Sequence, residues 1–235
     1  MNFESDIQKC LEVLQAGGII LYPTDTLWGI GCDATHEKAV EKIISIKEKT
    51  AASTSEGVRW NLSDKVRSPS FQRTESPSDL KREKDNANNT LASFRAGGKS
   101  FIVLISDDGM LKRFVKEVPA QAWNLIEVSD NPITIIYDAA RGLAKNVLAE
   151  DGSIGVRKVE DDFCQRLIHK FGKPIVSTSA NVSEDPSPKN YNEISEEIKN
   201  KVDYTVNWRQ DDFTKRKTSS IIKLKGNGEF VILRK

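Results

Sequence analysis

Apolar residues recur at helical intervals at the start of the chain. Their spacing of three or four positions predicts an amphipathic helix that ends at the glycine pair 17–18. The apolar positions are Phe3, Ile7, Leu11 and Leu14. The run IILYPT follows as a predicted strand, which stops at its proline.

A second helix is predicted downstream of a loop. Thr35 is a candidate N-cap, and Glu37 in the first turn suits the positive end of the helix dipole. One face of this helix carries Val40, Ile43, Ile44 and Lys47. The predicted order at the start of the chain is therefore helix, strand, loop, helix.

Short runs rich in β-branched residues predict the remaining strands. They cover 101–105, 132–137, 153–157, 174–179, 204–208, 219–225 and the final EFVILRK. Helical patterns separate several of these runs, and YNEISEEIKNKV, residues 191–202, predicts a further helix. The alternation indicates an α/β (α+β) chain with one mixed sheet or two fused ones.

Residues 50–98 interrupt this alternation of predicted helices and strands. They show no sustained helical or strand period, and serine, asparagine, proline and mixed charge dominate. Such a segment cannot bury enough apolar surface to offset ~1–2 kcal/mol of backbone entropy per residue, so we expect a mobile insert. The remaining length suits one core, which predicts a single domain over 1–235 that this insert interrupts.

The composition is ordinary for a globular chain and narrows the classes of partner. Of 235 residues, 38% are hydrophobic and 29% charged, and the net charge of +1 gives no bulk electrostatic reason for nucleic-acid or membrane binding. The first residues do not resemble a signal peptide, and no apolar run approaches the ~18 residues of a spanning helix. We expect no membrane association and a cytoplasmic location.

Metal-binding and nucleophilic motifs are scarce. The cysteines Cys10, Cys32 and Cys164 form no CxxC pair, and neither histidine stands near them at metal-ligand spacing. We therefore predict no zinc site and no disulfide framework. His36 and His169 fall on predicted exposed helix faces, and no G-x-S-x-G elbow is present, which disfavours a Ser-His-Asp mechanism.

Two polar segments at predicted strand ends carry the candidate chemistry. In LYPTDTLWGIGCD, residues 21–33, two threonines surround an aspartate, and in PIVSTSANVSEDPSP, residues 174–188, serines and an asparagine follow the strand. Small hydroxyls and an amide there can hydrogen-bond a polar ligand at close range. The alternative is that they only cap turns and satisfy backbone groups.

The same segments resemble motifs of the YrdC/Sua5 family of threonylcarbamoyl-adenylate synthases. LYPTDTLWGIGCDA is similar to the family's YPT(E/D)T-x-(Y/W/F)G(L/I)G signature, and PIVSTSANVS to its (S/T)SAN motif. Further family segments are matched by IKEK, NPITIIY, SIGVR, SSIIKL and VILRK. The resemblance covers nearly the whole chain outside the insert. It implies a YrdC-like twisted mixed sheet with flanking helices around a deep, positively lined cavity.

The activity implied by the resemblance is that of a nucleotidyltransferase. Such an enzyme joins L-threonine, bicarbonate or CO2 and ATP into threonylcarbamoyl-AMP and releases pyrophosphate. The product would serve N6-threonylcarbamoyladenosine modification of tRNA, with tRNA threonylcarbamoyltransferase proteins as its acceptors. Mg2+ would accompany ATP, which supplies part of its coordination, so no protein ligand is assigned. Weak binding of RNA, including double-stranded RNA, is a further implication.

Matching the family's motifs residue by residue implies two subsites. L-threonine would contact Thr26, Arg157, Ser177 and Ser219. ATP would contact Lys49, Lys99, Ser153, Ser179, Asn181, Ser187 and Arg234. Catalysis would be electrostatic and would need no histidine, because the phosphates would be held by the cations Lys47, Lys49 and Lys99.

Several assignments have a plain structural alternative. Thr26 would bind the substrate or stabilise a turn beside a proline. Arg157 would grip the amino-acid carboxylate by two parallel bonds or form a surface salt bridge. Arg234 could belong to a frayed tail, since it stands one residue from the end. Lys47 and Lys49 would also suit the solvated end of a helix.

The chain departs from the family's pattern at three kinds of position. Lys49 replaces an arginine, which exchanges a bidentate fork for a point charge. VSED lacks a glycine, and GVRKV lacks a proline. The insert separates Lys49 from Lys99, where relatives have only a few residues. Because loop-closure entropy grows only as about (3/2)RT ln n, we expect the fold to survive this insertion.

Two rival functions belong to the same resemblance. A non-catalytic RNA-binding module of this fold would bind tRNA with a marked salt dependence and form no adenylate. A carbamoyl-adenylate former of hydrogenase maturation would usually form part of a much longer chain with zinc-type cysteine pairs, which this sequence lacks.

Overall fold

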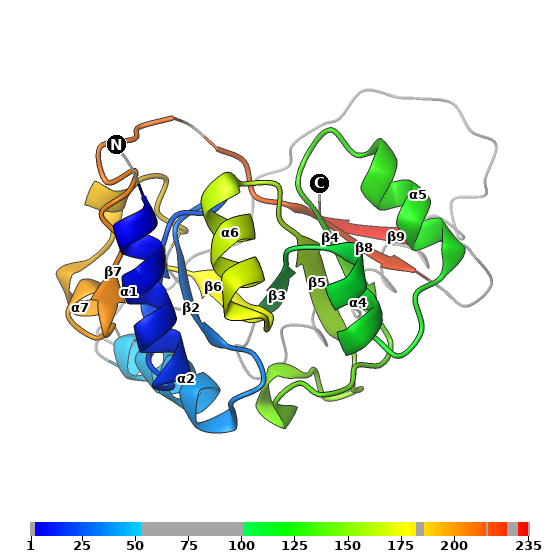
Figure 1. Ribbon diagram of the computed structural model, residues 1–235, viewed down its shortest axis with the longest axis horizontal. Helices are drawn as coiled ribbons and strands as arrows, with labels where there is room; N and C mark the ends of the chain where they lie inside the picture. Colours follow the sequence, from blue (N-terminus) through cyan, green and yellow to red (C-terminus); the bar gives the residue numbers. More distant parts are fainter. Residues whose placement is uncertain (1–2, 53–100, 182–185, 215, 225–229, 235) are drawn as a thin grey trace, which may run out of the picture.

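The computed structural model describes residues 3–52, 101–181, 186–214, 216–224 and 230–234, without the side chains of 49–52. These residues form one sheet and the helices around it (Figure 1). The helices are α1 (Glu4–Gln15), α2 (Glu37–Ala52), α4 (Asp108–Phe114), α5 (Ala120–Val128), α6 (Asp162–Phe171) and α7 (Glu196–Lys199). Single 3-10 turns lie at Lys145–Val147 and Tyr191–Glu193.

The described strands pair into one nine-stranded sheet in the order β7-β1-β2-β6-β3-β5-β4-β8-β9. They are β1 (Ile20–Tyr22), β2 (Gly29–Asp33), β3 (Ile102–Ile105), β4 (Ile133–Tyr137), β5 (Ile154–Lys158), β6 (Ile175–Ser179), β7 (Tyr204–Thr205), β8 (Ser220–Leu224) and β9 (Phe230–Arg234). The pairs β1–β7, β3–β5 and β4–β8 are parallel, and the other pairs are antiparallel. The predicted mixed α/β sheet is confirmed, as one sheet rather than two.

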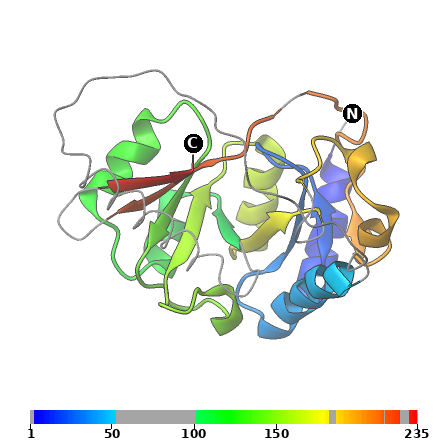
Figure 2. The ribbon, with the colours of Figure 1, turned by 180° about the vertical axis from the view of Figure 1, so that it is seen from behind.

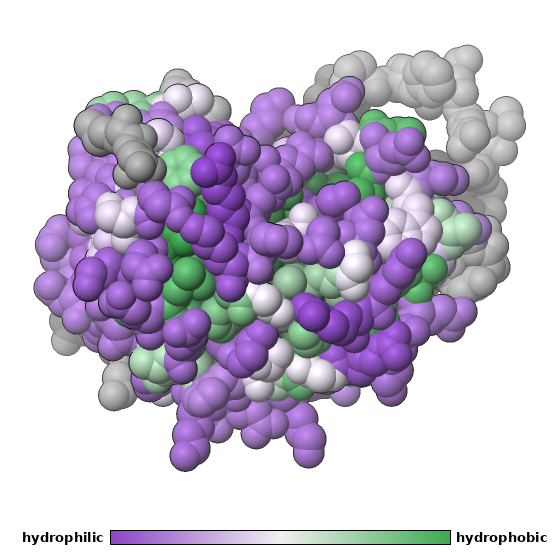
Figure 3. Space-filling model, in the orientation of Figure 1, coloured by the Kyte–Doolittle hydropathy of each residue, from purple (hydrophilic) through white to green (hydrophobic). Residues whose placement is uncertain are grey.

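Helices cover the sheet unequally on its two faces. In Figure 1, α1, α4, α5 and α6 lie in front of the sheet, whereas α2 lies behind it and is nearest the viewer in Figure 2. β1 and β2 are buried along their whole length, and α1 packs against α6. The face shown in Figure 3 is mainly hydrophilic, with apolar residues in small patches. No helix among the described residues is long and apolar enough to cross a bilayer.

The segment after the first strand is not the loop that we predicted. Gly29–Asp33 forms β2, which pairs with both β1 and β6. Its glycines allow this close pairing: a Cβ on Gly29 would lie 2.8 Å from Ser177 Oγ, and one on Gly31 would lie 2.6 Å from Tyr22 Cε1. Glycine is needed here because neighbouring chain segments occupy the space of a side chain.

The predicted helix 191–202 is also wrong, because polar caps divide it. Asn190 accepts hydrogen bonds from the amides of Asn192 and Glu193, which closes a short 3-10 turn. Ser195 then caps α7, a helix of only four residues, by accepting from the Ile198 amide. Serine and asparagine compete with the helical backbone in this way, and the apolar spacing does not reveal it.

Two further predictions need smaller corrections. The strand predicted over 204–208 stops at Thr205, because the Asp6 carboxylate accepts the amides of Asn207 and Trp208. His36, rather than Thr35, precedes α2, and its Nδ1 accepts from the Ala39 amide. The predicted insert 50–98 lies outside the described residues except for its first three, which continue α2 to Ala52.

Candidate active site

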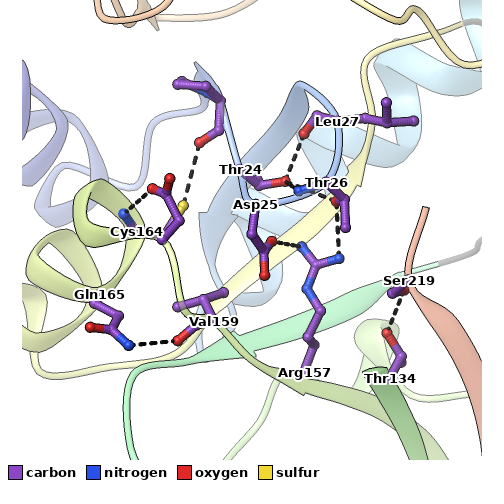
Figure 4. A network of polar contacts seen from close by, with 12 residues as sticks. Thr24, Asp25, Thr26, Leu27, Thr134, Arg157, Val159, Cys164, Gln165 and Ser219 are labelled. Carbon is purple, nitrogen blue, oxygen red and sulfur yellow. Dashed lines mark hydrogen bonds and ion pairs between the residues drawn. The ribbon is translucent and has the colours of Figure 1, made fainter. Parts of the chain in front are cut away.

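The loop between β1 and β2 holds two buried threonine hydroxyls (Figure 4). Thr24 Oγ1 donates to the Leu27 carbonyl at 2.7 Å and accepts from the Thr26 amide at 3.1 Å. A hydroxyl carries one hydrogen, so in the 2.9 Å contact between the two hydroxyls Thr26 is the donor. Thr24 therefore stabilises the turn, while Thr26 keeps lone-pair capacity for other partners.

Arg157 reaches this loop from β5. Its NH1 donates to Thr26 Oγ1 at 3.0 Å, and its NH2 lies 3.1 Å from Asp25 Oδ1. The side chain is only 4% exposed, so this ion pair lies in the interior and is not a surface salt bridge. Among the described residues nothing partners Nε. Because a guanidinium carries five N–H groups, these two contacts leave three of them unused.

Asp25 contacts the guanidinium from a different side than Thr26 does (Figure 4). Burial raises the pKa of the Asp25 carboxyl, Arg157 opposes this effect, and the nearby Asp161 adds to it. The net shift of the Asp25 pKa is upward, because the attraction of Arg157 does not fully offset the lost hydration of the carboxylate.

A cavity of about 110 Å³ lies beside Arg157 and Thr26. Its lining includes every predicted L-threonine contact and three of the predicted ATP contacts: Thr26, Arg157, Ser177, Ser219, Ser179, Ser187 and Arg234. Drug-sized ligands usually occupy about 300–1,000 Å³, so this cavity suits a small polar molecule better than a whole nucleotide.

The far wall of the cavity is a chain of hydrogen bonds between β4, β8 and β9. The Ser219 hydroxyl lies 2.8 Å from the Thr134 hydroxyl and accepts from Arg234 NH2 at 3.2 Å. Arg234 Nε also donates to the Ser219 carbonyl at 3.0 Å. Arg234 therefore belongs to a paired strand and is not part of a frayed tail.

Lys47 connects α2 to the end of β6. Its ammonium donates to the Ser179 carbonyl at 3.0 Å, the Asn181 carbonyl at 2.6 Å and Asn181 Oδ1 at 3.2 Å. The Ser179 hydroxyl in turn contacts Asn181 Oδ1. Burial lowers the pKa of Lys47 to about 8. Lys47 is thus buried at the site rather than solvated at a helix end, and its hydrogen bonds fix the positions of Ser179 and Asn181.

The remaining predicted site residues are distributed differently. Asn181 lines a neighbouring cavity, which shares Ser187 with the first. Ser153 is buried and donates to Asp151 Oδ1 at 2.6 Å, and it is not among the residues that line either cavity. The side chain of Lys49 and all of Lys99 lie outside the described residues.

Sequence reasoning missed two polar contacts of this site. Thr134 interrupts the apolar run ITIIY, and its full burial next to Ser219 becomes visible only in the sheet. Asp25 is part of the YPTDT motif, but nothing in the spacing predicts that it meets Arg157. Among the described residues, no three His, Cys, Asp or Glu side chains gather into a metal-binding group.

Known proteins resemble this chain over most of its length. The family model described as "Telomere recombination" (Sua5, yciO, yrdC) matches residues 12–54 and 84–235, more than half of the chain. A threonylcarbamoyl-AMP synthase from Pseudoalteromonas translucida is 25% identical over 186 residues, which are 78% of this chain and 75% of that protein. A second one, from Photobacterium profundum, is 24% identical over 196 residues, which are 82% and 81%.

Solved structures share the fold at low sequence identity. P. abyssi Sua5 complexed with L-threonine superposes with a TM-score of 0.66 at 19% identity over 94% of this chain. Our chain spans about half of that protein, because the match covers 51% of it. E. coli YciO superposes with a TM-score of 0.67 at 20% identity, over 98% of this chain and 89% of YciO.

Proposed function

The chain belongs to the Sua5/YciO/YrdC family, and on this basis we propose that it is a threonylcarbamoyl-AMP synthase. It would form threonylcarbamoyl-AMP from L-threonine, bicarbonate or CO2 and ATP, and release pyrophosphate. The observation that carries the proposal is the convergence of Thr26, Arg157, Ser177 and Ser219 on one small polar cavity. Relatives named for this activity, and a fold neighbour complexed with L-threonine, support it.

The proposed amino-acid subsite follows from the chemistry of its lining. Arg157 would hold the carboxylate with the N–H groups that Thr26 and Asp25 leave over, Nε included. The hydroxyls of Thr26, Ser177 and Ser219 would pair the substrate's polar groups. A buried site of this kind rejects analogues that lack a matching hydroxyl, because its own polar groups would be left unpaired.

The proposed nucleotide subsite lies toward Ser179, Ser187 and Arg234. Adenylate formation transfers negative charge to phosphate oxygens, which the Arg234 guanidinium would stabilise, as would the predicted cations Lys49 and Lys99. Lys47 would act mainly by fixing Ser179 and Asn181, because its ammonium already donates to three acceptors. The substrate's own carbamate oxygen would be the nucleophile. Mg2+ would be bound with ATP, and we assign it no protein ligand.

The wider assignment also remains a proposal. The product would pass to tRNA threonylcarbamoyltransferase proteins for N6-threonylcarbamoyladenosine modification of tRNA, and the proposed location is the cytoplasm. Direct binding of RNA, double-stranded RNA included, is a separate proposal that the adenylation reaction does not require.

Pyrophosphate release tests this function. The protein is incubated with ATP, Mg2+ and bicarbonate in three parallel reactions. One contains L-threonine, one contains L-2-aminobutyrate, which lacks the hydroxyl, and one contains neither amino acid. We expect release that depends on L-threonine and falls strongly with L-2-aminobutyrate. Release that is indifferent to threonine would contradict the proposal. Salt-dependent tRNA binding without any adenylate would instead support the RNA-binding alternative, and turnover of carbamoyl phosphate without threonine would support the hydrogenase-maturation alternative.

A further inference from the structure

Asp25 forms an ion pair with Arg157, the residue that would also bind the carboxylate of the proposed substrate. Its carboxylate meets NH2 of Arg157 at 3.1 Å, and Asp25 does not line the cavity. An internal carboxylate is therefore already bound to Arg157, while Nε and two other N–H groups remain for a ligand. A ligand carboxylate would share the guanidinium with Asp25 rather than replace it.

A second buried ion pair lies next to the first. Asp161, at the start of α6, lies 2.5 Å from Arg209 NH1, and its other oxygen accepts from the Cys164 amide at 3.0 Å. The Asp161 side chain is 3% exposed. Cys164 also faces Asp25, but burial raises the pKa of its thiol, so it stays neutral. The charged groups around Asp25 are thus Arg157, Asp161 and, through Asp161, Arg209.

The charges of these two ion pairs sum to zero when the cavity holds no ligand. A ligand carboxylate on Arg157 adds a negative charge beside the Asp25 carboxylate, in a cavity that the guanidinium of Arg234 also lines. The ammonium of the same amino acid, bonded to the neighbouring carbon, offsets only part of that charge. Like charges close together disfavour ionisation, so the added carboxylate must raise the pKa of the carboxyl that shares its guanidinium. Burial has already moved the pKa of Asp25 in this direction.

We propose that Asp25 is a positioning residue that shares Arg157 with the amino-acid carboxylate, so that substrate binding is coupled to proton uptake by Asp25. The inference rests on the proposed function, since it takes L-threonine as the ligand. Because binding takes up a proton, the protein with protonated Asp25 binds L-threonine more tightly than the protein with ionised Asp25. The affinity for L-threonine therefore falls as the pH rises from the pKa of Asp25 in the free protein to its higher pKa in the complex. Asp25 thereby sets the pH range of tight binding.

Calorimetric titration with L-threonine, from about pH 5 to about pH 7, tests the coupling, because neither end group of the free amino acid titrates there. For the wild type we expect Kd to rise with pH, by at most about tenfold per pH unit for one linked proton. The Asp25→Asn variant should bind with a flat pH profile, and at about pH 7 at least as tightly as the wild type.

The matched control is Asp33→Asn, which also removes a buried, ion-paired carboxylate but leaves Arg157 untouched. It should keep the wild-type pH profile. An Asp25→Asn variant that keeps that profile, or that binds more weakly at every pH, would overturn the proposal.

A second measurement uses only the wild type, in case Asp25→Asn does not fold. Titrations in buffers of different ionisation enthalpy report the protons taken up on binding. An uptake above zero and up to one proton supports the coupling, and zero uptake overturns it. Absence of any L-threonine binding would remove the proposed function together with this inference. Binding without pH dependence would remove the inference alone.

Discussion

Arg157 is the residue on which the proposed amino-acid subsite depends most. It is buried, contacts Thr26 and Asp25 at the same time, and still has unpaired N–H groups beside the cavity. A buried donor without a partner costs free energy, which a ligand that accepts from it would recover.

Replacing this arginine should affect both activity and stability. Arg157→Ala is expected to lower the kcat/KM for L-threonine by about 10²- to 10³-fold, the usual cost of losing a buried charge-assisted contact. The variant should lose up to about 3–5 kcal/mol of stability, because Asp25 is left buried and unpaired. That loss should shrink as the pH is lowered, because burial raises the pKa of the unpaired Asp25 carboxyl and protonation removes its charge. Steady-state kinetics and thermal melts measure both effects.

The control for this variant is Arg166→Ala on the exposed side of α6, which should leave threonine kinetics unchanged and cost at most about 1 kcal/mol through its contact with the Phe3 ring. An Arg157→Ala protein with wild-type threonine kinetics would refute our assignment of the amino-acid subsite.

Thr134 supports the opposite wall of the cavity. Thr134→Val keeps the shape but removes the hydroxyl that contacts Ser219, so we expect a loss of about 1 kcal/mol in stability. The KM for substrates should rise several-fold with a smaller change in kcat, because Ser219 would position Arg234 less well. Thr134→Ser should restore the KM. A Thr134→Val enzyme with unaltered KM would exclude this supporting role.

At the residue scale, the motif resemblance predicted which side chains gather at the cavity better than it predicted their partners. Thr26, Ser177 and Ser219 line it as expected. The contact between Asp25 and Arg157 could not be predicted, because it joins positions 132 residues apart through the packing of a loop on β5. Ser153 matches its motif equally well, yet its hydroxyl donates to Asp151.

At the scale of elements, Lys47 joins α2 to the strand end of β6. The pKa of Lys47 is lowered from 10.5 to about 8 by burial, so its ammonium loses a proton just above neutral pH. We expect activity to fall above about pH 8, as the contacts with Ser179 and Asn181 lose the positive charge. Lys47→Arg stays charged, so a folded variant with residual activity should lack this alkaline limb. The pH–rate profiles of both proteins are the measurement.

Unfolding does not explain such a limb. Between pH 8 and 10.5 the unfolded chain binds more protons at this lysine than the folded one, so the contribution of Lys47 to stability rises with pH. An alkaline limb that is identical in wild type and Lys47→Arg would mean that another group titrates.

Elements with a clear apolar period were predictable, and those shaped by polar side chains were not. α1 and the strands β3, β4, β5, β6, β8 and β9 lie within a residue or two of their predicted bounds. β2 was missed because its glycines are typical of loops, whereas here they make room for Tyr22 and β6. The helix 191–202 was predicted as one element because the apolar spacing does not show that Ser195 caps a new helix within it or that Asn190 closes a separate turn before it.

At the scale of the whole molecule, the sheet order brings the two polar segments together. β2 pairs with β6, so Gly29 lies opposite Ser179, although 150 residues separate them. The pairing of β4 with β8 then places Thr134 beside Ser219, which lines the same cavity. Periodicity could predict the strands but not their order, because long-range pairing depends on how the complete core packs. Only the family resemblance carried that information.

The segment that the family model leaves unmatched gives a prediction at this scale. Residues 55–83 separate its two matched ranges. Since loop-closure entropy changes only slowly with length, deleting them should alter stability by no more than about 1–2 kcal/mol. We expect threonine-dependent pyrophosphate release to persist. A deletion variant that folds but releases no pyrophosphate would show that the segment completes the site.

Detection of the product tests the central claim most directly. The purified protein is mixed with ATP, Mg2+, bicarbonate and L-threonine, and the nucleotides are separated and identified by mass spectrometry. Our account predicts one threonylcarbamoyl-AMP for each pyrophosphate released, and far less of both from Arg157→Ala. A folded wild-type protein that binds L-threonine and ATP but forms no threonylcarbamoyl-AMP would contradict the account.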